Sequence, residues 1–228
     1  MLAILHDDLQ PYRIGSDGKG LTSGRLTVLD GLISVRVWKR GPSERWMTMW
    51  FNPSRVVDPQ GWELAGLPAA QAALSHAWTL LRPLVTPRGS LESAALSRLD
   101  VATDFRDVLL PARYIRNLAD APHSGHGQRQ GIWSGAHRSH GETLYWRNKG
   151  GKVRLYDKNV ETRGRAPKGV LRFEVEARGK WCKRAGLSKV GDLCEERLTA
   201  LMRHRWASTH PPSGGCRSGA RGRRPCHR

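Results

Sequence analysis

In the first half of the chain, the pattern of hydrophobic and polar positions is first typical of strands and then of a helix. Short runs of strand-forming residues flank an Asp-Gly dipeptide in "RLTVLDGLISVRVWKRG", and this dipeptide is favoured in tight hairpins, so two antiparallel strands are predicted. The stretch "RWMTMWFNP" predicts a third strand that stops at an Asn-Pro pair. A helical stripe of Leu67, Leu74, Trp78 and Leu81 then predicts a helix across "LPAAQAALSHAWTLLRPL".

The second half predicts more strands than helices. Strands are expected at "SRLDVATDF", at "ETLYWRN" and "KVRLYDK" joined by a tight turn, and at "VLRFEVEARG". Helices are expected at "ARYIRNLAD" and at "SKVGDLCEERLTALMRH", with Ser188 as the N-cap of the latter. The segment "HSGHGQRQGIWSGAHRSHG" is predicted to be a loop. The expected fold is α+β, an antiparallel sheet with helices packed on one face.

Each late strand has one apolar and one polar face when its residues are taken with a period of two. In "KVRLYDK" the apolar side carries Val153 and Leu155, while Arg154, Tyr156 and Lys158 point the other way. The other two strands divide in the same manner. Their polar faces carry Arg98, Asp100 and Asp104 in one strand and Arg172, Glu174, Glu176 and Arg178 in the other. If the strands share a sheet, these side chains gather opposite the helices.

Composition adds a class of partner to this picture. The 228 residues contain 38 Lys and Arg against 20 Asp and Glu, a formal net charge of +18. Such a surface attracts polyanions, of which nucleic acid is the commonest. No apolar run is long enough for a membrane span, the start lacks a signal-peptide pattern, and the four Cys show no CxxC spacing, so a cytoplasmic protein without membrane association is expected.

The chain is expected to divide into a domain at 1–206 and a disordered basic tail at 207–228. The tail has five Arg, no acidic residue and no apolar periodicity. This tail has two interpretations: a natural DNA-binding arm, or a truncated or frame-shifted terminus.

The polar faces suggest metal-assisted chemistry on phosphate. Carboxylates from Asp100, Asp104, Glu174 and Glu176 would lie around the Tyr156 hydroxyl, and clustered carboxylate oxygens are the usual ligands of Mg²⁺ or Mn²⁺. The alternative is a salt-bridged surface on which the neighbouring Arg side chains pair with these acids. The pattern alone leaves both interpretations open.

The order of "SRLDVATDF", "ETLYWRNKGGKVRLYDKNVE" and "VLRFEVEARG" resembles the rolling-circle replication initiators of filamentous phages and related plasmids, and "MTMWFNPSRVV" resembles an earlier strand and turn of that family. The likeness runs from about Met47 to Arg205. It implies a strand-nicking enzyme that attaches itself to DNA through a 5′-phosphotyrosyl link. The implied partners are single-stranded or supercoiled origin DNA, with host helicase and polymerase.

The resemblance also assigns roles to residues. Tyr156 is implied as the nucleophile, with Lys158 as the cation on the scissile phosphate. Asp100 and Glu174 are the implied metal ligands, followed by Glu176 and Asp104. DNA contacts are expected from Arg154, Arg98, Arg172 and Lys152. The terminal Glu161 of the motif is explained equally well by a structural salt bridge.

The chain departs from the family in three respects. It has no His-hydrophobic-His pair, since its histidine pairs enclose polar residues and lie in the predicted loop, and it is shorter than the phage initiators. Tyr145, two strand residues from Arg147, could be a second hydroxyl, but nothing in the sequence favours this over a packing role. The alternative function is therefore a non-catalytic DNA-binding or regulatory protein on the same fold.

Overall fold

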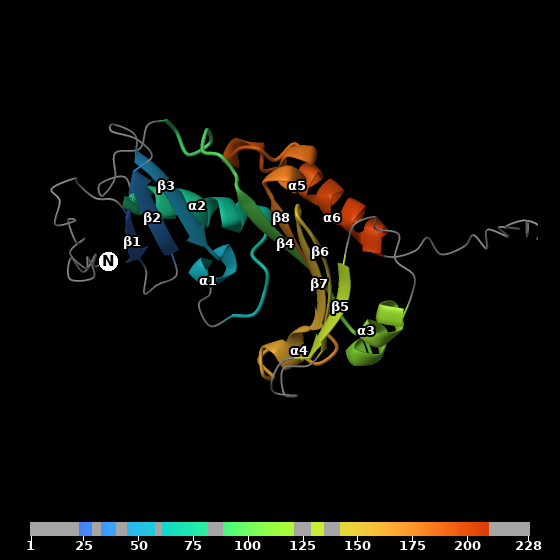
Figure 1. Ribbon diagram of the computed structural model, residues 1–228. Coiled ribbons are helices and arrows are strands. Elements are labelled where there is room, and N and C mark those ends of the chain that lie inside the picture. The colour runs from blue at the N-terminus through green and yellow to red at the C-terminus, as the bar shows by residue number, and fades with distance from the viewer. Residues whose placement is uncertain are drawn as a thin grey trace, which may run out of the picture.

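The computed structural model describes residues 23–28, 33–39, 45–57, 61–81, 89–120, 129–134 and 142–209. These residues form two antiparallel sheets and a set of helices, so the predicted α+β class is confirmed (Figure 1). The expectation of one sheet was wrong, because the early strands pair with one another and with none of the later strands described.

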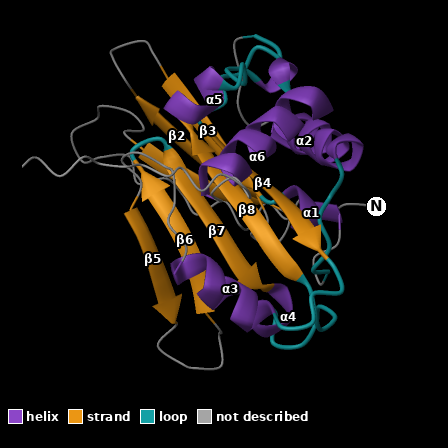
Figure 2. Ribbon diagram, turned by 90° about the vertical axis from the view of Figure 1, so that its right-hand side faces the viewer, coloured by secondary structure: helices purple, strands orange, loops and turns teal. Residues whose placement is uncertain are grey.

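The first sheet has three strands in sequence order, β1 (Ser23–Val28), β2 (Ile33–Lys39) and β3 (Arg45–Phe51). All three were predicted from the pattern. Two helices follow, α1 (Pro53–Val57) and α2 (Leu67–Leu81), and the second has the predicted extent. Figures 1 and 2 both place α2 beside this sheet.

The second sheet has five strands, and its order differs from the order in the sequence. It contains β4 (Arg98–Phe105), β5 (Arg129–Ser134), β6 (Glu142–Asn148), β7 (Gly151–Asp157) and β8 (Leu171–Arg178), arranged as β4-β8-β7-β6-β5. The last strand of the chain thus lies between β4 and β7. This order brings the three strands with mixed acidic and basic faces side by side.

The loop prediction for the His- and Gly-rich segment was wrong at residues 129–134. These residues form β5, the edge strand that pairs with β6 from Arg129 opposite Arg147 to Ser134 opposite Glu142. Flanking Gly and polar residues hide the strand in the sequence, and hydrogen bonds from β6 supply the pairing that local preference lacks. The histidines on either side of β5 lie outside the described residues.

Three helices cover one face of the five-stranded sheet: α3 (Pro111–Asp120), α5 (Gly179–Arg184) and α6 (Glu195–Thr209) (Figure 2). Their buried side chains, among them Ile115, Trp181 and Leu201, join one core with the apolar residues of the strands. The strand residues of that core are Leu144, Trp146, Val153, Leu155, Leu171, Phe173, Val175 and Ala177. For this sheet, the predicted arrangement of helices on one face is confirmed.

The start and the end of the last helix differ from the prediction. Ser188 is no helix cap, because its backbone N–H donates to the Asp192 carboxylate at 2.9 Å and its carbonyl accepts from Leu96 at 2.8 Å. Residues 188–192 instead lie along residues 92–96 and end in a short 3₁₀ turn, Val190–Asp192. Helix α6 continues to Thr209, three residues into the predicted tail. The rest of that tail, 210–228, lies outside the described residues.

The turn between β6 and β7 depends on glycine because a core side chain lies directly against it. A Cβ added to Gly150 would lie 2.1 Å from the Trp181 indole nitrogen, and Trp181 is only 2% exposed. The indole is held in the core and cannot give way at low cost.

We expect Gly150→Ala to destabilise the fold by about 3 kcal/mol, through overpacking against Trp181. Gly179→Ala is the matched control, because nothing lies within 4 Å of its added Cβ. The control should lose no stability. Urea unfolding curves of both variants provide the measurement, and equal midpoints would contradict the close packing of this turn.

Candidate functional site

The strand register arranges the polar side chains of the five-stranded sheet in rows. Asp100 lies opposite Glu176, and Glu176 lies opposite Lys152. One row along, Glu174 lies opposite Arg154, which lies opposite Tyr145. The next row runs from β4 to β6 and contains Asp104, Arg172, Tyr156 and Thr143. The predicted division of each strand into an apolar and a polar face is confirmed.

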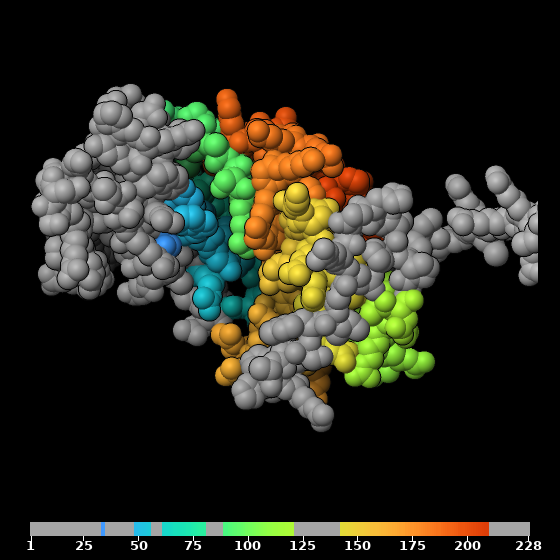
Figure 3. Space-filling model, viewed as in Figure 1, coloured from blue at the N-terminus to red at the C-terminus, as the bar shows by residue number. Residues whose placement is uncertain are grey.

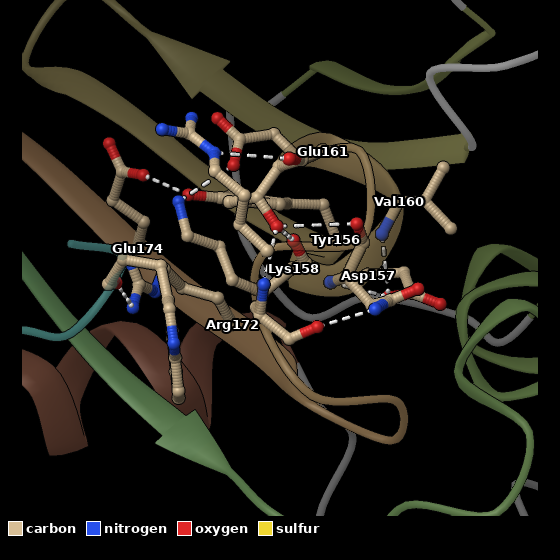
Figure 4. A network of polar contacts seen from close by, with 12 residues as sticks. Tyr156, Asp157, Lys158, Val160, Glu161, Arg172 and Glu174 are labelled. Atoms are coloured by element: carbon tan, nitrogen blue, oxygen red, sulfur yellow. Dashed lines mark hydrogen bonds and ion pairs between the residues drawn. The ribbon is translucent and has the colours of Figure 1, made fainter. Parts of the chain in front are cut away.

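Tyr156 lies at the centre of this face and is hydrogen-bonded to a carboxylate. Its hydroxyl donates to Glu174 Oε2 at 2.9 Å (Figure 4). The Arg154 guanidinium contacts Oε1 of the same carboxylate. The tyrosine is only 8% exposed. Burial raises the pKa of Tyr156 well above its ordinary value, and the negative charge of Glu174 raises it further. As it stands, the phenol is a hydrogen-bond donor held in its neutral form.

The Nε donor of Arg154 is unused within the described part of the chain. Arg154 forms an ion pair with Glu174, and its guanidinium carbon lies 6.0 Å from the centroid of the Tyr156 ring. Its Nε is buried and has no hydrogen-bond partner among the described residues. A guanidinium with an unused donor beside a hydroxyl is suited to donate to an additional anionic oxygen.

Lys158 is held beside the Tyr156 ring. Asp157 caps the short helix α4 (Lys158–Glu161) by accepting from the N–H groups of Asn159 and Val160, and this fixes the start of the turn. Lys158 Nζ lies 2.7 Å from Glu161 Oε2 and 5.7 Å from the Tyr156 ring centroid. Glu161 therefore makes the structural salt bridge that was one of its two interpretations (Figure 4).

Asp104 and Arg172 bind each other. Arg172 donates from Nε and Nη2 to the two carboxylate oxygens at 2.6 and 2.8 Å, and the side chains are 11% and 7% exposed for Asp104 and Arg172. Arg172 also donates to the Trp62 carbonyl at 2.9 Å. The predicted metal ligand and the predicted DNA contact thus form a buried pair that ties the α1–α2 connection to the sheet. In Figure 3 the surface is hollowed between the cyan α1–α2 region and the gold strands.

Glu176 and Asp100 are also matched by cations. Glu176 lies 2.6 Å from Arg178, 3.2 Å from Arg98 and 3.5 Å from Lys152. Arg98 donates in addition to Asp100 at 2.9 Å. Burial alone would raise the pKa of Glu176, but the hydrogen bond from Arg178 and the charges of Arg98 and Lys152 outweigh burial and lower it.

The lowered pKa of Glu176 has a consequence for acid stability. A carboxyl whose pKa is lower in the folded than in the unfolded chain stabilises the fold above its unfolded pKa of about 4.3. That contribution is lost as the pH falls through the folded value.

We expect the stability advantage of the unaltered chain over Glu176→Gln to be largest near pH 7 and to shrink below about pH 4.3. Urea unfolding at a series of pH values provides the measurement. Glu63→Gln, in an exposed pair with Arg106, should show a much smaller difference. A constant difference for Glu176→Gln across the series would contradict the assignment.

The described residues do not form a site that fits Mg²⁺ or Mn²⁺. Four carboxylates share the polar face as predicted, yet no group of three or more His, Cys, Asp or Glu side chains in the described part of the chain is arranged to hold a metal ion. Their oxygens bind guanidinium and ammonium groups. The salt-bridged interpretation describes their arrangement.

Two features of this face were missed or undervalued in the sequence. Tyr145 is half-buried on the polar face opposite Arg154, with the Arg147 guanidinium 5.7 Å from its ring centroid. The period of two in "ETLYWRN" already placed both on this side. The carbonyl of Trp62 gave no signal, because its partner Arg172 lies 110 residues away.

Within the described part of the chain, no helix has both the length and the apolar character needed to cross a bilayer. Comparison with protein-family models, curated protein sequences and solved structures finds no match to this chain.

Proposed function

We propose that this protein is a replication initiator that nicks one strand of origin DNA with Tyr156 and starts rolling-circle replication of a phage or plasmid. The motif order supports this, as does the net charge of +18. The observation that carries the proposal is the 2.9 Å hydrogen bond from the Tyr156 hydroxyl to Glu174, with Arg154, Lys158 and Arg172 around the ring. A hydroxyl nucleophile needs an adjacent base. Tyr156 supplies the hydroxyl and Glu174 supplies the base.

DNA binding would change the partners of this pair. A phosphate arriving at Arg154 competes with Glu174 for the guanidinium, and the unpaired Nε offers it a donor. Once Arg154 turns to the phosphate, Glu174 keeps its hydrogen bond to the phenol and lies where it can take the phenol proton. The buried, neutral tyrosine is the resting state of the proposed reaction.

The reaction then balances within the protein, the DNA and water. The Tyr156 oxygen forms a bond to phosphorus while the bond from phosphorus to the 3′ oxygen breaks. The phenol proton passes to Glu174, the departing 3′ oxygen takes a proton from water to leave a free 3′-OH, and Glu174 returns its proton to the solvent. Arg154 and Lys158 stabilise the charge that develops on the phosphoryl oxygens. The resemblance to the initiator family implies Mg²⁺ or Mn²⁺, but none of these steps involves a metal ion.

A search for a covalent adduct tests the proposal. The protein is incubated with single-stranded and with supercoiled DNA from its own replicon, with Mg²⁺, with Mn²⁺ and with a chelator, and is then denatured. A protein–DNA band that survives denaturant, together with a free 3′-OH that a polymerase extends, is expected. Tight DNA binding without an adduct under any of these conditions would contradict the enzyme.

A non-catalytic DNA-binding or regulatory protein is the second candidate, and one observation favours it. Each of the four carboxylates on the face is paired with a cation, and the pKa of Tyr156 is raised by its burial and by Glu174. A rigid, salt-bridged face of this kind can bind phosphates without chemistry. The same experiment separates the candidates, because only the enzyme leaves an adduct.

A further inference from the structure

Two adjacent leucines are exposed in the connection between β4 and α3. Leu109 is 95% exposed and Leu110 is 60% exposed. Tyr114, which is also exposed, follows Leu110 by four residues and so lies on the same side of the first turn of α3. Single exposed leucines are common, but a contiguous apolar patch marks an interaction site. Leu109, Leu110 and Tyr114 are called the apolar tip below.

The chain holds this tip in place from both sides. Before the leucines, the backbone N–H of Val108 donates to the Gly169 carbonyl at 3.0 Å, and the Val108 side chain packs against the core. After them, the buried Pro111 begins α3. Asp107, the only acid in residues 106–110, has a φ of 60°, which a residue other than glycine rarely adopts. The leucines are therefore presented to solvent by an anchored segment.

The apolar tip follows the strand end that lies beside the proposed nucleophile. Tyr156 shares a strand row with Arg172 and Asp104. Asp104 precedes Leu109 by five residues, at most about 18 Å of extended chain. Figures 1 and 2 both place α3, which follows the tip, and α4, which follows Tyr156, at the same end of the five-stranded sheet.

Exposed cations flank the apolar tip. The loop at 162–169, which is hydrogen-bonded to the base of the tip, has no acidic residue and carries Arg163, Arg165 and Lys168 on the surface. Arg113 is exposed in the first turn of α3. None of these four cations forms an ion pair with a described residue. Apolar side chains flanked by unpaired cations match DNA, in which phosphates flank the apolar faces of stacked bases.

We infer that the apolar tip is a wedge that enters between neighbouring base pairs of duplex DNA and unstacks them close to Tyr156. The inference rests on the proposed function, because it states how one strand of the origin is released for nicking. Leu109 and Leu110 replace a stacked neighbour, and Tyr114 stacks on an exposed base. The flanking cations bind the phosphates.

Nicking of single-stranded and of supercoiled DNA from the same replicon tests the wedge. Leu109→Ser combined with Leu110→Ser should form the denaturant-resistant adduct with single-stranded DNA at the rate of the unaltered chain. With supercoiled DNA, the adduct should form about 10-fold more slowly, because no apolar side chain offsets the loss of base stacking. Both leucines are exposed, so the fold should persist, and an unchanged urea midpoint checks this.

Leu109→Met combined with Leu110→Met is the matched control. It keeps an apolar tip of similar size and should nick both DNA forms as the unaltered chain does. Equal losses on single-stranded and supercoiled DNA in the serine variant would overturn the wedge, and so would an absence of loss on both.

Permanganate oxidation of unstacked thymines measures base opening without relying on nicking. The test uses Tyr156→Phe, so that no nick relaxes the supercoiled DNA. This protein should make thymines reactive, and adding the two serine substitutions should lower the reactivity about 10-fold. If the unaltered chain forms no adduct with single-stranded DNA but the thymines respond in this way, the nicking proposal fails and the wedge stands. Thymines that stay unreactive, or react equally with and without the serines, would overturn the wedge.

Two other occupants of the apolar tip would give different results. If the serine variant opens DNA normally but loses binding to vesicles of phosphatidylcholine and phosphatidylserine, the tip contacts an anionic membrane surface. If it opens DNA normally but sediments as a smaller species than the unaltered chain, the tip joins two copies of the protein. Either result would overturn the wedge.

Discussion

Tyr156→Phe will abolish the denaturant-resistant protein–DNA adduct and leave DNA affinity within about twofold of the unaltered chain. The substitution removes the one oxygen that the proposed reaction joins to phosphorus, so no slower route to the same product remains. Affinity should persist because it comes mainly from the many Lys and Arg side chains that contact phosphates. The measurements are denaturing gels for the adduct and binding isotherms at a stated salt concentration.

The fold should tolerate the change. Glu174 keeps its ion pair with Arg154 when the phenol hydroxyl is lost, so we expect a cost of only about 1 kcal/mol. Tyr145→Phe is the matched control, since Tyr145 lies on the same polar face and makes no hydrogen bond to a carboxylate in the described residues. An adduct that survives Tyr156→Phe but disappears in Tyr145→Phe would move the nucleophile one strand along.

Asp104→Ala will destabilise the protein by about 3–5 kcal/mol, because it leaves the buried Arg172 without its carboxylate. Both side chains are nearly excluded from solvent, and the Trp62 carbonyl alone cannot neutralise a guanidinium. Urea unfolding without added metal provides the measurement. Glu142→Ala, which breaks the exposed pair with Arg116, should cost much less.

A double variant separates this role from metal binding. Asp104→Ala combined with Arg172→Met removes both charges and should recover most of the lost stability, because no unpaired ion remains. If Asp104 instead served a metal ion, its removal would leave the metal-free protein as stable as before and raise the metal concentration needed for nicking. Unchanged stability of Asp104→Ala in a chelator would thus contradict the structural pair.

Local pattern was sufficient for much of this fold. The described strands apart from β5, the helices α2 and α3, and the hairpin at Gly150 follow from apolar periodicity and turn residues, which act within a few positions of the chain. The side on which each polar residue lies also follows, since successive side chains in a strand alternate. Tyr156, Arg154 and Glu174 could therefore be placed on one face before any strand was paired.

Other elements depended on partners elsewhere in the chain. Strand β5 exists through its pairing with β6, and the segment at 188–192 lies against residues 92–96 where the sequence predicts the first turn of a helix. Local preference is weak at both places, so long-range hydrogen bonds decide the outcome.

The sequence by itself determined the composition of the polar face: two tyrosines, four carboxylates and an excess of cations, all on the side opposite the apolar residues of the same strands. Only the tertiary structure decided which acid meets which base. The strand order β4-β8-β7 sets Asp104 against Arg172, 68 residues away, and brings the Tyr156 hydroxyl within hydrogen-bond distance of Glu174 on the neighbouring strand. Side-chain alternation is a property of one strand, whereas register is a property of two, and the pairing of distant strands is fixed by the packing of the whole sheet on its helices.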